Sequence, residues 1–208
     1  MADYPELNQF LESGEPWWIK HWHWGREFLS YTGRNKSEHT YTRFRNEIER
    51  FLVWLFQIKA LPMEQLRKAD ILEYADFCWQ PPVSWICLAN HEKFVFTDGY
   101  YYQNTDWAPF KLKVAKSNKS NAQVDKKKYK PSQQTLRATF TAIIAFYKYL
   151  MNEEYLYGNP AQIAKSDCRH FIKDAQVKEV RRLSEAQWQY VFEVAVKLAD
   201  QDPLHERS

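Results

Sequence analysis

The stretch SEHTYTRFRNEIERFLVWLF (residues 37–56) has the hydrophobic spacing of an amphipathic helix. Its apolar side chains recur every three or four residues and are Tyr41, Phe44, Ile48, Phe51, Leu52, Leu55 and Phe56. Ser37 stands where a helix N-cap is expected. The polar side chains away from this stripe are Arg43, Asn46, Glu47 and Arg50. We therefore predict a helix from about residue 38 to residue 56 that buries one face and begins with exposed cationic turns.

Two further segments have helical spacing. One follows Pro62 and ends at Pro81-Pro82, because proline cannot continue a helix. The other begins at the N-cap candidate Ser132 and stops at the turn Gly158-Asn159-Pro160. Its apolar positions have near-heptad spacing and are Leu136, Phe140, Ile143, Tyr147 and Leu150. These helices predict a mainly α fold, a small bundle.

Residues 79–131 differ from the helical segments on either side. KFVFTDGYYYQ alternates in hydrophobicity and turns at Asp98-Gly99, which is typical of a β-hairpin. KLKVAKSNKSNAQVDKKKYK (residues 111–130) then holds eight lysines and one acidic residue, Asp125. We predict that residues 79–131 are an insertion in the helical domain, consisting of a hairpin and a lysine-rich loop. Such a concentration of charge indicates an anionic partner or a solvated loop.

The flanking segments suggest further divisions of the chain. Residues 1–36 form an aromatic-rich leader, and residues 161–182 have the polar, basic composition of a linker. Ser184 begins another helix with Gln187 at the capping-box position. Its apolar stripe consists of Trp188, Val191, Phe192, Ala195 and Leu198. Because the chain ends before it offers this stripe a packing partner, we interpret residues 183–208 as the truncated start of a second domain.

Composition restricts the cellular setting. The chain has 208 residues, 45% of them hydrophobic, and contains no apolar run of membrane-spanning length. Its N-terminus lacks the features of a secretory signal. The three cysteines lack the spacing of a metal site, which favours a reducing cytoplasm. We expect a cytoplasmic protein without a metal or another cofactor.

Four segments together resemble the tyrosine recombinase (phage integrase) family. They are HTYTRFRNEIERFLVWL, ADILEYADF, SQQTLRATFTAIIAFYKYLMNEEYLYGNPA and RRLSEAQWQYVFEVA. The first three are similar to the helical core-binding domain of that family (residues 37–160 here). The last is similar to the opening helix of its catalytic domain. The resemblance covers residues 37–78 and 132–200, just over half of the chain.

The resemblance implies duplex DNA binding, because the corresponding helices of the family lie against the major groove. A helix N-terminus favours phosphate, and arginine or glutamine one turn further in can reach base edges. The candidate residues near the two helix starts are His39, Thr40, Arg43, Arg45, Gln133, Gln134, Arg137 and Thr141. Further candidates for contacts to the DNA backbone are Lys126, Lys127, Lys128, Lys130, Lys165 and Arg169.

The resemblance also implies what these residues do not do. The family cleaves DNA with a tyrosine nucleophile assisted by arginines, a lysine and histidines, and we expect those groups beyond the end of this chain. HWGR (residues 23–26) matches a family pattern by letter only, because it precedes the DNA-binding helices. We therefore expect binding without cleavage, with self-association on DNA, in a bacterial, nucleoid-associated protein. No membrane and no small-molecule substrate is expected.

Other interpretations of the same residues remain open. Arg43 and Arg45 could pair with Glu47 and Glu49 at helical spacing, for a few tenths of a kcal/mol each. The chain could be a helical protein–protein adaptor whose aromatic leader forms the interface. It could also bind single-stranded nucleic acid by stacking bases on the aromatic residues of the hairpin. A metal site at Cys78, Cys87 and His91 is disfavoured by their irregular spacing.

Overall fold

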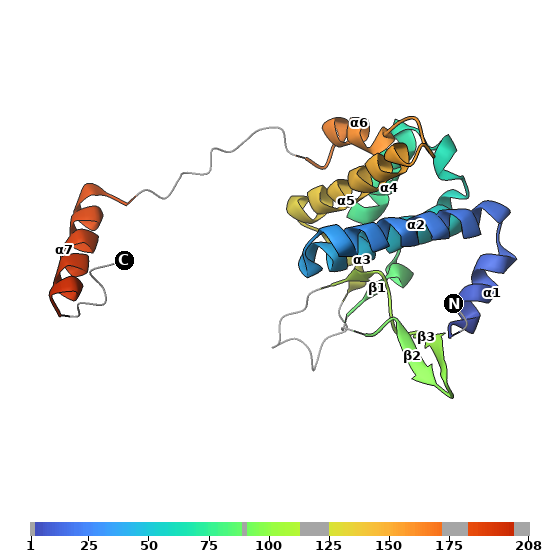
Figure 1. Cartoon of the computed structure of the whole chain (residues 1–208), viewed down its shortest axis with the longest axis horizontal. Coiled ribbons are helices and arrows are strands. Elements are labelled where there is room, and N and C mark those ends of the chain that lie inside the picture. The colour runs from blue at the N-terminus through green and yellow to red at the C-terminus, as the bar shows by residue number, and fades with distance from the viewer. Residues whose placement is uncertain (1–2, 89–90, 113–124, 172–182, 202–208) are drawn as a thin grey trace. The chain divides into compact units, whose positions relative to one another are not determined.

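The computed structural model describes residues 3–88, 91–112, 125–171 and 183–201, and it divides the chain into two compact units, Met1–Phe171 and Ile172–Ser208. The fold is mainly α with small two-stranded sheets inserted, as predicted (Figure 1). The α-helices in the described residues are α1 (Pro5–Ser13), α2 (Pro16–Asn35), α3 (Glu38–Trp54), α4 (Lys68–Trp79), α5 (Gln133–Asn152), α6 (Pro160–Asp167) and α7 (Glu185–Gln201). In the part of the chain described, no helix is both long and apolar enough to cross a membrane.

The aromatic leader forms α1 and α2, and α2 packs along α3 as part of the bundle. Proline occupies an early position of both helices, where its missing N–H costs nothing. Phe28 of α2 stacks on Phe44 of α3 with ring centroids 5.9 Å apart. Gly25 permits the close approach, since a Cβ atom there would lie 2.8 Å from Leu52. The aromatic leader is therefore packed over the bundle.

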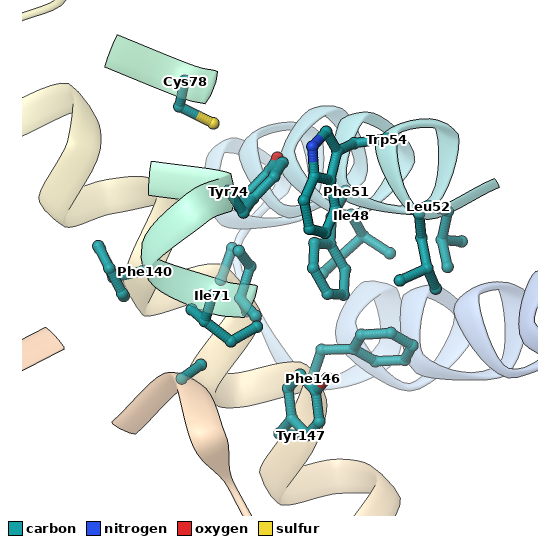
Figure 2. Close-up of a cluster of buried hydrophobic side chains, with 14 of the residues drawn as sticks. Ile48, Phe51, Leu52, Trp54, Ile71, Tyr74, Cys78, Phe140, Phe146 and Tyr147 are labelled. Atoms are coloured by element: carbon teal, nitrogen blue, oxygen red, sulfur yellow. The ribbon is translucent and has the colours of Figure 1, made fainter. Parts of the chain in front are cut away.

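The core is built from α3, α4 and α5 (Figure 2). Phe51 of α3 lies at its centre, with its ring centroid 5.1 Å from that of Tyr74 and 6.4 Å from that of Tyr147. Trp54 and Phe146 are also fully buried. The helical stripes predicted from sequence thus face one another. Close packing of aromatic rings from three helices fixes the positions of those helices, and therefore of their N-termini, relative to one another.

Two helix boundaries differ from the sequence-based expectation. α3 ends at Trp54, and a π-helical turn (Leu55–Lys59) leads to Ala60 in the left-handed conformation. The residues after Pro62 form a 3-10 turn (Met63–Gln65), and α4 begins only at Lys68. The carboxylate of Asp70 accepts the Arg67 N–H at 2.7 Å, so this residue caps the helix start. A local hydrogen bond therefore decides where α4 begins.

The predicted hairpin is present. β2 (Phe94–Thr97) pairs antiparallel with β3 (Tyr100–Gln103), and Asp98 and Gly99 have positive φ values of 52° and 86°, as a tight hairpin turn requires. β1 (Ile86–Cys87) pairs in parallel with β4 (Phe110–Lys111). Phe110 is buried against Phe77 of α4, which attaches the insertion to the core. Residues 113–124 of the lysine-rich loop lie outside the described residues.

The segment expected to be a linker begins with a helix. Asn159 caps α6 by accepting the Gln162 N–H at 3.1 Å, and its side-chain amide donates to the Ile144 carbonyl, also at 3.1 Å. Ala161 and Ala164 are buried where α6 packs on α4 and α5. Two alanines three residues apart are a weak hydrophobic signal, so composition alone suggested a linker. Residues 172–182 of that segment lie outside the described residues.

The second unit contains α7, which starts as predicted. The Ser184 N–H donates to Gln187 at 2.9 Å, and the Gln187 N–H donates to Ser184 Oγ at 3.3 Å, so the two residues form a capping box. Within the described residues of this unit, the apolar side chains of the helix, including Trp188 and Phe192, are exposed.

A buried histidine links α2 to the 3-10 turn. His21 Nδ1 lies 2.5 Å from the Trp17 carbonyl oxygen, and Nε2 lies 2.9 Å from the Glu64 carboxylate. The Met63 N–H also donates to Nε2 at 3.0 Å, which requires an unprotonated nitrogen. Burial lowers the pKa of His21, although the Trp17 carbonyl and the Glu64 carboxylate oppose this effect. The folded protein therefore favours the neutral imidazole.

We expect the free energy of unfolding to fall as the pH drops below about 6.5, the ordinary pKa of histidine. In that range His21 of the unfolded chain takes up a proton before His21 of the folded chain, so protonation favours unfolding. Urea denaturation at pH 7.5, 6.5 and 5.5 measures the effect. His21→Gln, which cannot titrate, should lose less stability than wild type over this interval. Parallel losses in the two proteins would show that His21 is not responsible.

Candidate nucleic-acid interface

The start of α3 exposes two of the predicted side chains. Ser37 Oγ accepts the Thr40 N–H at 3.4 Å, and the two hydroxyl oxygens are 3.0 Å apart, so the Thr40 hydroxyl belongs to the cap. His39 and Arg43 are exposed and lie one turn apart on the same edge of the helix. This edge therefore presents a cation next to free backbone N–H groups.

Arg45 lies on a different face from Arg43. Residues two positions apart in an α-helix are separated by about 200° around its axis. Arg45 instead lines a groove together with Glu49 and residues of α1 and α2. The structure thus splits the predicted set on α3, leaving His39 and Arg43 on one edge and placing Arg45 elsewhere.

The acidic residues of α3 do not neutralise either arginine. Glu47, which was expected away from the buried stripe, is buried and pairs with Arg50 at 3.0 Å. Glu49 pairs with Lys93 from the insertion. The alternative in which these carboxylates take Arg43 and Arg45 is therefore wrong. Both arginines are exposed and form no ion pair with any described residue.

Arg50, the ion-pair partner of Glu47, is itself fixed by contacts to the insertion. Its guanidinium donates to the Pro109 carbonyl at 3.2 Å and lies 4.5 Å from the centroid of the Phe110 ring. Burial alone would lower the pKa of Arg50, but the adjacent Glu47 carboxylate raises it, so Arg50 stays charged. A buried carboxylate held in this way is unavailable to other cations on the helix.

The start of α5 presents a single exposed stripe. Ser132 Oγ accepts the Thr135 N–H at 3.1 Å and caps the helix, as predicted. Gln134, Arg137 and Thr141 are exposed and lie on one face, because they are separated by three and four residues. The Thr141 hydroxyl donates to the Arg137 carbonyl at 2.8 Å within the helix. Gln133 is half-buried and lies off this stripe.

Arg137 is anchored without being neutralised. Its guanidinium lies 4.4 Å from the centroid of the Phe171 ring, an arrangement that leaves the N–H groups free to donate. Thr141 and Lys148 continue the exposed stripe along the helix. The stripe therefore has a positioned arginine with amide and hydroxyl neighbours, which is the chemistry of base-edge recognition.

Four of the predicted lysines lie directly before α5. Lys126–Lys128 form a 3-10 turn whose cap is Asp125, since Oδ1 accepts the Lys127 N–H at 2.9 Å. Tyr129 is half-buried against Phe110, with ring centroids 5.6 Å apart. Lys127, Lys128 and Lys130 are exposed and Lys126 is half-buried. A short turn tied to the core thus holds a concentrated positive charge at the helix start.

The two helix starts lie at the same end of the first unit. In Figure 1, α3 and α5 both begin at the left of that unit and run to the right, opposite to α2. Phe51 and Tyr147 mark a contact between them, and Ser37 and Ser132 precede these residues by similar lengths of helix, about 21–23 Å at 1.5 Å per residue. We call this end, with His39, Arg43, the lysine turn 126–130 and the Gln134–Arg137–Thr141 stripe, the basic end.

Lys165 and Arg169 have different surroundings. Arg169 donates to both carboxylate oxygens of Asp76, at 3.1 and 2.9 Å, so its charge is neutralised. His170 contacts the same carboxylate at 2.6 Å and stacks on Trp79. Lys165 is half-buried on α6. Arg169 and His170 attach the end of the first unit to α4, and Arg169 has the contacts of a structural residue.

Sequence reasoning overlooked other cations near the interface. Arg34 and Lys36 are exposed on the last turn of α2 and its cap, immediately before Ser37. Their position next to a predicted N-cap was a usable signal. Lys148 was overlooked on α5, where it lies seven residues after Thr141 and so on the same stripe.

Comparisons with known proteins add no assignment: no family model, curated protein or solved structure matches this chain. Among the residues that the structure describes, no group of three histidine, cysteine or acidic side chains could hold a metal ion. Cys78, Cys87 and Cys168 are free thiols, all buried.

Proposed function

We propose that this chain binds duplex DNA through the basic end, as the DNA-binding part of a site-specific tyrosine recombinase. The observation that supports this most is the state of the arginines. Arg43 and Arg137 are exposed near two helix N-termini, while Glu47, the carboxylate at helical spacing that could neutralise Arg43, is buried and engaged with Arg50. Solubility alone does not require arginines at helix N-termini to stay free of ion pairs.

The proposed mechanism divides the work between two kinds of side chain. Lysines 126–130 and the backbone N–H groups at the helix starts hold phosphates and orient the duplex, without reading sequence. Arg43, Gln134 and Arg137 reach the base edges, where arginine pairs with guanine and glutamine with adenine. The chemistry of strand cleavage would need a tyrosine nucleophile with its cationic partners, and we propose that these residues bind without cutting.

Fluorescence anisotropy with a labelled random 30-bp duplex, at 50 to 200 mM salt, tests the proposal. We expect binding whose affinity falls steeply with salt, since each phosphate neutralised releases counterions. Duplex should compete better than single-stranded DNA of the same length. Absence of a salt-dependent signal would overturn the proposal and favour an adaptor, whereas better competition by single strands would favour stacking on the hairpin.

Substitution of Arg43 and Arg137 should distinguish contacts that recognise the base sequence from contacts that only orient the duplex. On a site selected from a random library, Arg43→Ala and Arg137→Ala should each cost about 1–3 kcal/mol of binding and relax sequence preference. Arg169→Ala is the matched control, because Asp76 already takes its charge. Unchanged preference in both test variants, or an equal loss in the control, would contradict the assignment of base-reading roles.

One surface favours an additional protein contact. Phe96 and Tyr100 on the hairpin are 61% and 46% exposed, and Lys93 at its base is engaged with Glu49. Exposed aromatic rings on a hairpin whose own lysine is already paired suit a protein partner better than a nucleic acid strand. The adaptor alternative placed its interface on the aromatic leader; because the leader packs in the bundle, we propose the hairpin instead, and Phe96→Ser is expected to leave duplex affinity unchanged.

A further inference from the structure

A groove of about 860 Å³ runs between α2 and α3 on one side and α1 with the hairpin on the other. Buried side chains from α1, α3 and the π-helical turn line it: Leu11, Ile48, Leu52 and Phe56. Tyr4 stacks on Tyr101 and the Tyr101 N–H donates to the Asp3 carbonyl at 2.7 Å, so α1 and the hairpin form one wall. A groove of this size and apolar lining is within the range of small-molecule sites.

The groove changes in polarity along its length. Trp22, Arg26 and Leu29 share one face of α2, and Arg45 and Val53 share one face of α3, by their helical spacing. Because Gly25 lies against Leu52 and Phe28 against Phe44, antiparallel packing places Arg26 and Arg45 toward one end and Trp22 and Val53 toward the other. The groove is therefore basic at one end and apolar at the other.

The apolar end is lined with aromatic rings. Trp18 stacks on Phe56 with centroids 5.0 Å apart, and Phe10 lies 5.0 Å from Trp18. Phe10, Trp22 and Phe56 all line the groove, and Leu7 of α1 completes this part of the wall. Such a lining accepts a hydrocarbon chain and offers it no charged partner.

The basic end has an excess of positive charge. Arg26 and Arg45 are exposed and form no ion pair with any described residue, while Lys93 takes the charge of Glu49. Burial lowers the pKa of Lys93, and the nearby positive charge of Arg45 acts in the same direction. His91 and Glu92 also line the mouth. An anion placed in this part of the groove would be attracted by two arginines that no described carboxylate neutralises.

We propose that this groove binds a single-chain fatty acid, with its carboxylate between Arg26 and Arg45 and its hydrocarbon chain along Phe10, Trp22 and Phe56. Charge complementarity selects the head group, and the apolar end selects the chain. The site does not depend on the proposed DNA function, because Arg45 lies on a face of α3 different from that of Arg43.

Isothermal titration calorimetry with dodecanoate, below its micellar concentration, tests the site. We expect saturable binding at one site per chain, weakened roughly tenfold in Arg45→Ala and in Arg26→Ala, the loss of a charged hydrogen bond. Arg34→Ala, an exposed arginine of α2 outside the groove, is the matched control and should bind like wild type. Dodecanol, which has the same chain length but no charge, should bind more weakly than dodecanoate.

Val53→Trp supplies an independent test, because it fills the groove and leaves both arginines in place. Binding of dodecanoate should be lost in this variant while circular dichroism shows that the helices remain. If Val53→Trp does not fold, the exposed arginine variants still decide the question. The proposal would be overturned by the absence of saturable binding, by equal affinity for dodecanol and dodecanoate, or by an Arg34→Ala loss equal to that of Arg45→Ala.

Discussion

Replacing Lys126, Lys127, Lys128 and Lys130 together with glutamine is expected to weaken duplex binding by roughly 10²–10³-fold at 0.1 M salt. Each lysine that contacts a phosphate contributes about 0.9 to the slope of log affinity against log salt, so the slope should flatten by as much as about 3–4. The loss should be similar for every duplex sequence, since phosphate contacts carry no base information. Anisotropy titrations at several salt concentrations measure both quantities.

The structure provides a control for the lysine substitutions. Lys68 is also an exposed lysine, but it pairs with Asp167 at 2.9 Å, so Lys68→Gln should leave the salt slope near its wild-type value. Asp125 and Tyr129, which hold the turn, are unchanged in the test variant. If the fourfold variant kept the wild-type slope, the lysine turn would not contact phosphate, and the basic end would lose its largest concentration of charge.

Replacing Phe51 with alanine is expected to destabilise the first unit by about 3–5 kcal/mol. The ring is fully buried among α3, α4 and α5, and its removal leaves a cavity that contacts with Tyr74 and Tyr147 cannot close. Domains of this kind have free energies of unfolding of about 5–15 kcal/mol, so the variant is expected to be only marginally stable. Urea denaturation followed by circular dichroism gives the loss directly.

The matched control for this substitution is Phe96→Ala on the exposed hairpin. Because Phe96 is 61% exposed, the change should stay within about 0.5 kcal/mol of wild type. Duplex affinity of Phe51→Ala should fall together with its folded fraction, because Phe51 positions the helices that carry the basic end. A loss for Phe51→Ala no larger than that for Phe96→Ala would contradict the arrangement of the core.

Features that depend on local sequence could be predicted, and features that depend on distant partners could not. The caps at Ser37, Ser132 and Ser184 and the Asp98-Gly99 turn involve residues a few positions apart, and all four were correct. The start of α4 was placed too early, directly after Pro62, although the hydrogen bond from the Arg67 N–H to Asp70 that fixes it is also local. α6 was missed, because the burial of its alanines results from packing on α5 and on α4, which is distant in the sequence.

The same distinction applies to the candidate interface. The exposure of His39, Arg43, Gln134 and Arg137 followed from helical periodicity alone. The partners of Glu49 and Arg169 did not, because Lys93 lies 44 residues from Glu49 and Asp76 lies 93 residues from Arg169. Sequence reasoning therefore found the cations, but it could not show which of them were already neutralised.

Amide hydrogen exchange of the whole chain, with and without duplex DNA, shows directly whether the two helix starts contact DNA. We predict added protection at residues 37–45 and 125–141 in the presence of duplex, with residues 94–103 of the hairpin unchanged. Protection confined to the hairpin, or no change at either helix start under conditions where DNA is bound, would contradict this prediction.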